Sequence, residues 1–217
     1  METMYGSVSR PVPRGFWRTN MIHAPNMLLI GAAGRDAGKT TFACEMIRHF
    51  HGMSLLAAKV TAIQEKDGRC PRGGEGCGVC SSLKGDYCIT EETDPDGDKD
   101  TQRLMAAGAT RVLWLRVLKQ KLKVGAQALM AALGTVSPIL CESNSLRLVV
   151  EPGLFLMLQN QNSPKIKHSA QAVLPYANKI IMTDGEIFHF NIENIIVKNN
   201  MWQLSNQTTR PHLFPNP

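Results

Sequence analysis

A glycine-bearing segment near the start of the chain has residue types suited to holding phosphate. Residues 33–40, AGRDAGKT, fit the phosphate-loop pattern G-x-x-x-x-G-K-[ST] except at the first position, where Ala33 replaces glycine. In such a loop backbone N–H groups surround the phosphates, a lysine reaches the β- and γ-phosphates, and a hydroxyl ligates Mg²⁺. The alternative is a glycine turn that binds nothing. We expect nucleotide binding by Gly34, Arg35, Asp36, Ala37, Gly38, Lys39, Thr40 and Thr41, with Thr40 on the Mg²⁺.

A magnesium-dependent phosphate site also needs an acidic residue, usually at the end of a second buried strand. Glu142 ends the apolar run PILCE and is the first candidate. Asp100 opens the helix-like run DTQRLMAAG and is the second, although Asp is also a favoured helix N-cap. Both roles of Asp100 stay open. Lys39, Glu142 and Asp100 are therefore the predicted catalytic residues.

Four cysteines form a second candidate site. Cys70, Cys77, Cys80 and Cys88 have the spacing C-x6-C-x2-C-x7-C inside residues 65–100, a segment rich in glycine and charge. Four thiolates suit Zn²⁺ or an iron–sulfur cluster, and a bound metal could order a segment that has few apolar side chains to bury. The alternatives are two disulfides or four free thiols. The other two cysteines, Cys44 and Cys141, are expected in the core.

The elements that must position these residues alternate along the chain. Strands are expected over 26–31, 54–63, 111–117, 137–143, 153–160 and 178–184, and helices over about 40–50, 99–109, 119–136 and 164–176. This alternation predicts a P-loop three-layer α/β sandwich with a mainly parallel sheet, a cysteine-rich insertion and a small C-terminal hairpin over 186–199. We expect a flexible lead-in over 1–25, one nucleotide-binding domain over 26–200 with the insertion at 65–100, and a tail over 201–217.

Composition narrows the classes of partner. The 217 residues carry a formal charge of +6, but the lysines and arginines are scattered, with no basic block interleaved with aromatic residues. This disfavours nucleic acid, and nucleotide phosphates suffice to explain a locally positive site. No apolar run approaches the roughly 20 residues that span a bilayer. The first 25 residues lack the pattern of a secretory signal, so we expect no membrane association and a cytoplasmic location.

Several segments together resemble a known family. GAAGRDAGKTT, AAKVT, KDTQRLMAAGATRV, and CESNSL followed by PGLFLML are similar to the P-loop proteins grouped with molybdopterin-guanine dinucleotide biosynthesis protein B. The broader class includes dethiobiotin synthetase and the nitrogenase iron protein. The resemblance implies a Mg²⁺-dependent protein that binds GTP or ATP, often as a homodimer, and assists cofactor maturation beside a partner protein. It places Lys59, Asp100 and Glu142 at the active site and phosphate on Gly34, Gly38, Lys39, Thr40 and Thr41.

Together with this resemblance, which implies the maturation role, these observations favour a Mg²⁺-dependent GTPase or ATPase that assists cofactor or metal-centre maturation, such as molybdenum cofactor biosynthesis, with a four-cysteine metal-binding loop. No [NT]-K-x-D motif marks guanine recognition, so the choice between ATP and GTP stays open. The alternatives are a small-molecule kinase or ligase-type enzyme, and a nucleotide-binding module without turnover. The lack of an evident general base beside the loop favours the accessory protein over the kinase.

Overall fold

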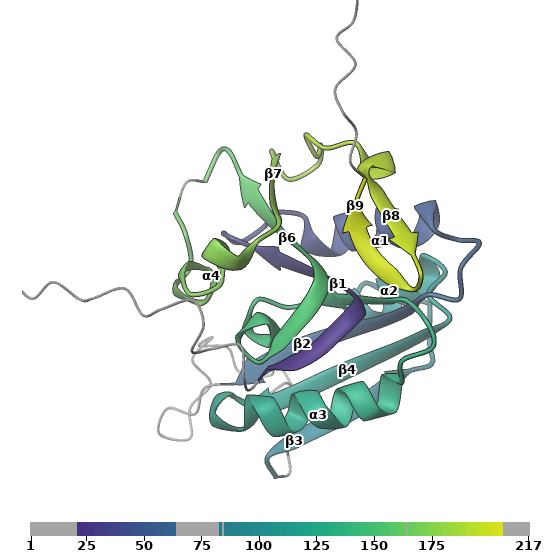
Figure 1. Cartoon of the computed structure of the whole chain (residues 1–217). Coiled ribbons are helices and arrows are strands. Elements are labelled where there is room, and N and C mark those ends of the chain that lie inside the picture. Colours follow the sequence, from purple (N-terminus) through teal and green to yellow (C-terminus); the bar gives the residue numbers. More distant parts are fainter. Residues whose placement is uncertain (1–20, 64–82, 84, 164, 206–217) are drawn as a thin grey trace, which may run out of the picture.

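A seven-stranded sheet runs through the centre of the protein, in the order β3-β4-β2-β5-β1-β6-β7 (Figure 1). The structure, a computed structural model, describes residues 21–63, 83, 85–163 and 165–205. Every neighbouring pair is parallel except β3 and β4. The strands are β1 Ile22–Ala32, β2 Leu56–Ile63, β3 Tyr87–Glu92, β4 Arg111–Leu118, β5 Ile139–Glu142, β6 Val150–Asn160 and β7 Lys179–Thr183. The predicted α/β class with a mainly parallel sheet is confirmed.

Strand β1 occupies an inner position between β5 and β6. The run Met27 to Ile30 is fully buried, as expected for an inner strand of a parallel sheet that is covered on both faces. Because the chain reverses its direction of strand addition around β1, the carboxyl edge of β1 is a switch point of the kind that binds ligands in open α/β sheets.

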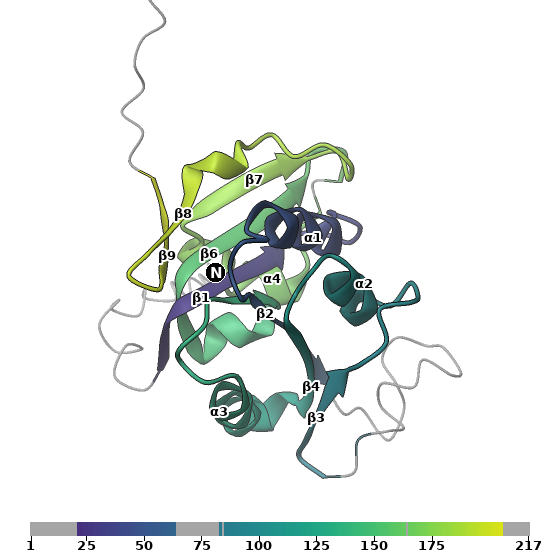
Figure 2. The same ribbon diagram turned by 90° about the vertical axis from the view of Figure 1, so that its right-hand side faces the viewer.

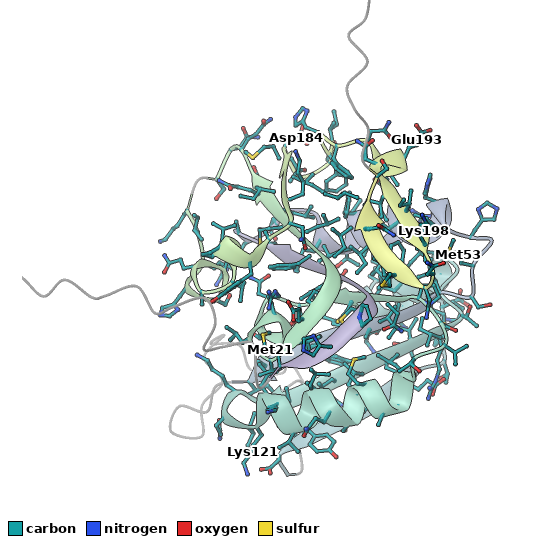
Figure 3. All side chains as sticks on the ribbon, in the orientation of Figure 1. Met21, Met53, Lys121, Asp184, Glu193 and Lys198 are labelled. Atoms are coloured by element: carbon teal, nitrogen blue, oxygen red, sulfur yellow. The ribbon has the colours of Figure 1, made fainter. Side chains whose placement is uncertain are left out.

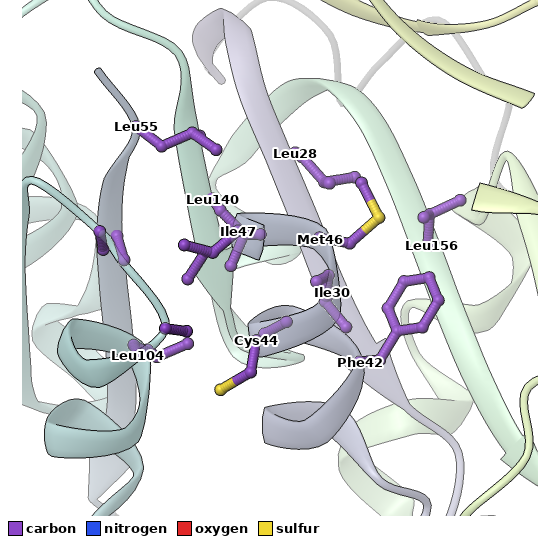
Figure 4. Packing of buried hydrophobic residues seen from close by; sticks show 14 of the residues in the cluster. Leu28, Ile30, Phe42, Cys44, Met46, Ile47, Leu55, Leu104, Leu140 and Leu156 are labelled. Carbon is purple, nitrogen blue, oxygen red and sulfur yellow. The ribbon is translucent and has the colours of Figure 1, made fainter. Parts of the chain in front are cut away.

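Helices cover the two faces of the sheet. α1 (Lys39–His49) and α2 (Asp100–Ala106) lie on one face, and α3 (Leu122–Leu133) lies on the other (Figure 2). Phe42 and Met46 of α1 pack against Leu28 and Ile30 of β1, and all four side chains are fully buried (Figure 4). Burying each contributes about 1.5–3 kcal/mol, so this face anchors the helix that follows the glycine-bearing loop.

α3 lies unusually close to the sheet. An added Cβ at Gly125 would stand 2.7 Å from Cγ2 of Val117 on β4, so glycine is required for this approach. Glycine lowers helix stability relative to alanine, and this close approach is the reason it is present in α3. No helix among residues 21–63, 85–163 and 165–205 is both long and apolar enough to cross a membrane.

The C-terminal hairpin forms later in the chain than predicted. It consists of β8 (Ile195–Lys198) and β9 (Met201–Leu204), joined by Asn199 and Asn200 with φ of 52° and 59°. Two left-handed residues make the two-residue turn that suits a hairpin, and Asn tolerates them. The predicted small C-terminal hairpin is therefore present, but it spans residues 195–204 rather than 186–199, and β9 begins at residue 201, where the tail was expected to begin. Figure 3 shows Lys198 on the hairpin and Lys121 beside α3 at the far side of the molecule.

Trp202 ties this hairpin to the domain. Its side chain is 1% exposed and meets Phe50 edge-on, with ring centroids 5.0 Å apart. Burial of a whole indole makes β9 part of the core cluster under α1 rather than part of a frayed end.

Three further boundaries differ from expectation. β1 begins at Ile22 and buries Ala24, so the lead-in over 1–25 ends earlier than predicted. Instead of one helix over 164–176, the chain forms α4 (His168–Gln171) and a short 3-10 helix, Leu174–Tyr176, which contains a proline that cannot donate to a longer helix. Within 65–100, residues Tyr87–Glu92 form the edge strand β3 instead of a loop.

Candidate functional site

The loop between β1 and α1 requires glycine at position 38 for two reasons, its backbone conformation and its close contacts. Gly38 has φ of 69°, in the left-handed region, and an added Cβ would stand 2.9 Å from Cζ of Phe188 and 3.0 Å from the carbonyl of Gly185. Asp36 also has a positive φ, 50°, and both it and Arg35 are exposed. Alternating left-handed residues turn successive N–H groups toward one side, the geometry of an anion-binding concavity.

The loop departs from the phosphate-loop pattern at Ala33, and the structure explains why alanine is tolerated there. The N–H of Ala33 donates to the carbonyl of Leu158 at 2.8 Å, and its carbonyl accepts from the N–H of Lys167 at 2.8 Å. Ala33 therefore extends the pairing of β1, and its φ is not positive. Glycine's conformational freedom is not needed at this position.

Asn144, which sequence reasoning did not single out, fixes the start of the loop. Its Nδ2 donates to the carbonyl of Ala32 at 2.9 Å, and its Oδ1 accepts from the N–H of Ala32 at 2.8 Å. A Cβ at Gly31 would stand 2.9 Å from that Oδ1. Asn144 follows β5, so one amide fastens the loop to the strand that carries Glu142. A single Asn after a strand belongs to no recognisable motif, so the sequence alone could not have predicted this role.

Three elements bring the predicted charged residues together. The Thr40 hydroxyl, in the first turn of α1, lies 3.0 Å from Oδ1 of Asp100 and 3.3 Å from Oε2 of Glu142. Lys59 of β2 donates to Oδ2 of Asp100, and its Nζ lies 3.7 Å from Oε2 of Glu142. Lys59, Asp100 and Glu142, with Thr40, form what we call the acid–lysine cluster. Asp100 is the first residue of α2, whose N-cap is Lys99, so Asp100 does not serve as that cap.

The acid–lysine cluster suits a divalent cation. Oε1 of Glu142 is buried and has no hydrogen-bond partner among the described residues. One hydroxyl proton of Thr40 cannot serve two carboxylates at once, and the two carboxylates outnumber the single ammonium of Lys59. Mg²⁺ prefers oxygen ligands and commonly takes one or two carboxylates beside phosphate oxygens. Thr40, Asp100 and Glu142 offer such a donor set.

Two cations flank the loop without an acidic partner among the residues that the structure describes. Lys39, the first residue of α1, makes no ion pair with any described residue. Nη2 of Arg103, one turn after Asp100 on α2, donates to the Thr41 hydroxyl at 3.2 Å, and no carboxylate within the described ranges pairs with it. Sequence reasoning missed Arg103, although a residue three positions after Asp100 shares its helix face. Uncompensated cations at the start of α1 favour an anionic ligand there.

The predicted cysteine site is only partly in view. Cys70, Cys77 and Cys80 lie outside the described residues, whereas Cys88 lies in β3, with its Sγ 3.4 Å from Nη2 of Arg116. Within the described part of the chain, no group of three or more His, Cys, Asp or Glu side chains could hold a metal ion.

Cys44 and Cys141 are buried, as predicted. Burial raises the pKa of both thiols above the ordinary value, so both stay protonated near neutral pH. Neither is suited to be a thiolate ligand.

Comparison with protein-family profiles, curated proteins and solved structures found no match to this chain.

Proposed function

We propose that the chain binds a nucleoside triphosphate, ATP or GTP, with Mg²⁺ and hydrolyses it in support of cofactor or metal-centre maturation. The observation that carries this is the Thr40 hydroxyl between the carboxylates of Asp100 and Glu142, two residues after the left-handed Gly38. A glycine turn that binds nothing has no need of two carboxylates beside its first helical hydroxyl. The resemblance to the P-loop family supports the same function.

Cationic and acidic residues of the chain have different roles in this proposal. Loop N–H groups and the start of α1 hold the phosphates, while Lys39 neutralises their charge. Arg103 adds a second cation on the Thr41 side. Thr40, Asp100 and Glu142 would hold the Mg²⁺, which supplies charge stabilisation to the phosphates when bound. Lys59 fixes the orientation of both carboxylates.

The remaining parts of the proposal rest on the sequence. The four cysteines, Cys70, Cys77, Cys80 and Cys88, bind one Zn²⁺ or one iron–sulfur cluster, and the chain acts as a homodimer beside a cofactor-biosynthesis protein. Element analysis of anaerobically purified protein, with a visible spectrum, tests the metal. Four freely titrating thiols in a metal-free folded protein would exclude it.

Calorimetric titration with ATP and GTP, with and without Mg²⁺, tests nucleotide binding. Lys39→Ala should weaken triphosphate affinity at least about 100-fold, or about 2.7 kcal/mol, because the ammonium makes no ion pair with any described residue and would neutralise phosphate charge. Lys198→Ala, which removes an exposed lysine from the hairpin, is the matched control and should bind as the wild type does. Equal affinity in Lys39→Ala and wild type would reject the assignment of this loop as a phosphate-binding site. An assay of inorganic phosphate formed from the bound triphosphate then separates hydrolysis from binding alone.

A further inference from the structure

The ammonium of Lys59 lies against both carboxylates of the acid–lysine cluster. It donates to Oδ2 of Asp100, and its Nζ lies 3.7 Å from Oε2 of Glu142. The Thr40 hydroxyl lies against the same two side chains, 3.0 Å from Oδ1 of Asp100 and 3.3 Å from Oε2 of Glu142. The ammonium and the hydroxyl therefore share Oε2 of Glu142.

The backbone keeps Lys59 beside Glu142. The two are paired residues of the parallel strands β2 and β5, so their side chains leave the same face of the sheet from strands about 4.8 Å apart. The Glu142 side chain is 1% exposed and the Lys59 side chain 22% exposed. Glu142 therefore cannot turn to water, whereas the ammonium can move on its flexible four-carbon stem.

One oxygen of the cluster is not compensated by Lys59. Oε1 of Glu142 is buried and has no hydrogen-bond partner within the described part of the chain. A buried carboxylate oxygen without a partner is costly, and the ammonium approaches only the other oxygen, Oε2. A divalent cation carries twice the charge of the ammonium, so it would compensate the carboxylate of Glu142 more fully.

A divalent cation at this cluster would compete with Lys59. It would bind oxygens that the ammonium already contacts, and two cations at one partly buried carboxylate repel each other. Within the described ranges no group of three or more His, Cys, Asp or Glu side chains could hold a metal ion, so the cluster offers two carboxylates and a hydroxyl. Mg²⁺ needs about six oxygen ligands, and the rest must come from water or from phosphate.

We propose that Lys59 competes with the metal at the acid–lysine cluster: its ammonium excludes Mg²⁺ alone and yields the carboxylates to Mg²⁺ that binds together with a triphosphate. The inference rests on the proposed function in one respect, that the cluster is the Mg²⁺ site. A triphosphate changes the balance because it supplies oxygen ligands to the metal and acceptors to the displaced ammonium. Metal and nucleotide then bind as a pair, and the cluster does not take up metal beforehand.

A different role for Lys59 predicts the opposite result. If the ammonium only holds the carboxylates in the orientation that a metal needs, its removal weakens the binding of divalent cations. If the ammonium competes for their oxygens, its removal strengthens that binding. The sign of the change therefore separates the two roles.

Electron paramagnetic resonance of Mn²⁺ measures this sign in the full chain without nucleotide. Mn²⁺ prefers the same oxygen ligands as Mg²⁺, and the sharp signal of the unbound ion falls as it binds. Lys59→Met keeps an unbranched side chain and removes the charge, and Lys59→Arg keeps the charge. Lys121→Met is the matched control, because Lys121 forms an exposed ion pair with Asp86, 3.0 Å apart and outside the cluster.

We expect Lys59→Met to bind one Mn²⁺ at least tenfold more tightly than wild type, and Lys59→Arg and Lys121→Met to bind as weakly as wild type. Adding Glu142→Gln to Lys59→Met should abolish the gain, which locates the ion in the cluster. Mg²⁺ should also raise the thermal midpoint of Lys59→Met more than that of wild type, because a ligand stabilises the folded state that binds it. If Lys59→Met does not fold, Lys59→Gln takes its place in each measurement.

Equal or weaker Mn²⁺ binding in the folded Lys59 variants without charge would overturn the proposal. A gain that persists with Glu142→Gln would also overturn it, since the ion would lie elsewhere. Triphosphate binding with Mg²⁺ in the calorimetric titration, without a Mn²⁺ gain, would keep the proposed function and reject this role of Lys59. A Mn²⁺ gain without any triphosphate binding would reject the nucleotide and keep Lys59 as a competitor of the metal.

Discussion

The glycine-bearing loop and the acid–lysine cluster meet at Thr40, but the chain builds them differently. The loop consists of consecutive residues, and its shape follows from the positive φ of Asp36 and Gly38 and from the helix that begins at Lys39. The cluster draws Lys59, Asp100 and Glu142 from separate elements, and Glu142 lies 102 positions from Thr40.

This difference determines how each part can fail. A change in the loop acts on a local backbone conformation. The cluster depends on sheet register, since Lys59 and Glu142 are paired residues of β2 and β5. A slip of one residue in β5 would turn Glu142 to the opposite face of the sheet. Phosphate binding should therefore respond to local substitutions, and metal dependence should respond to changes in the strands.

Gly38→Ala should break the loop and leave the cluster's residues in place. The left-handed φ of 69° and the contacts at 2.9 and 3.0 Å together should cost about 3 kcal/mol of unfolding free energy. Chemical denaturation measures that loss, and triphosphate affinity should fall with it. Gly52→Ala is the control, because nothing lies within 4 Å of the added carbon. Equal stability of the two variants would contradict the strained-loop description.

Asn144→Ala tests whether the loop depends on β5. Removing the amide leaves the N–H and carbonyl of Ala32 without their side-chain partner, which should cost about 2 kcal/mol. Asn162→Ala, an exposed asparagine, should change stability little. If Asn144→Ala lowers stability while triphosphate affinity stays intact, the loop holds its shape without β5.

Glu142→Gln keeps the side-chain shape and removes one charge from the cluster. We expect the strengthening of triphosphate binding by Mg²⁺ to fall about tenfold, or about 1.4 kcal/mol, with affinity in the absence of Mg²⁺ nearly unchanged. Glu186→Gln, an exposed carboxylate in the turn after β7, is the control. An unchanged magnesium effect would pass the ligand role to Asp100 alone.

The smallest expected effect concerns the chemical reactivity of Cys44 and Cys141 in the folded protein. Because burial raises the pKa of both thiols, neither should react with iodoacetamide at pH 8 in the folded protein, and both should react after denaturation. Peptide mapping by mass spectrometry measures each cysteine separately. Labelling of Cys141 in the folded state would show that β5, and Glu142 with it, opens on that time scale.

Raised thiol pKa values also set a direction for pH dependence. The unfolded chain loses these thiol protons first, so their contribution to stability is complete below the ordinary thiol pKa and declines as pH rises above it.

Sequence patterns predicted the six parallel strands of the sheet because their signals are local, whereas β3 was not predicted. The apolar run of β1 and the triplet Gly38, Lys39 and Thr40 can each be recognised from a few consecutive residues. Helix α1 was expected over about 40–50 and spans Lys39–His49. The position of the hairpin was not predicted because its turn is marked only by Asn199 and Asn200, whereas the apolar pattern begins before residue 195.

The charged residues of the candidate site could be predicted from the sequence, but the hydrogen bonds that join them to other elements could not. Lys59, Asp100 and Glu142 were each expected, and the structure brings them together. The roles of Asn144 and Arg103 were not predicted, because those roles depend on which elements become neighbours in space.

The inner position of β1 has a consequence for synthesis of the protein. β1 pairs only with β5 and β6, which emerge from the ribosome more than 100 residues after it. At about 5–20 residues per second, the strand that leads into the loop waits on the order of ten seconds for its partners. During that interval the apolar run from Met27 to Ile30 has no sheet to join. If the proposed nucleotide site is correct, a nascent chain should acquire nucleotide affinity abruptly, once residue 160 has left the exit tunnel, and chaperones that bind exposed apolar strands should meet β1 before β5 and β6.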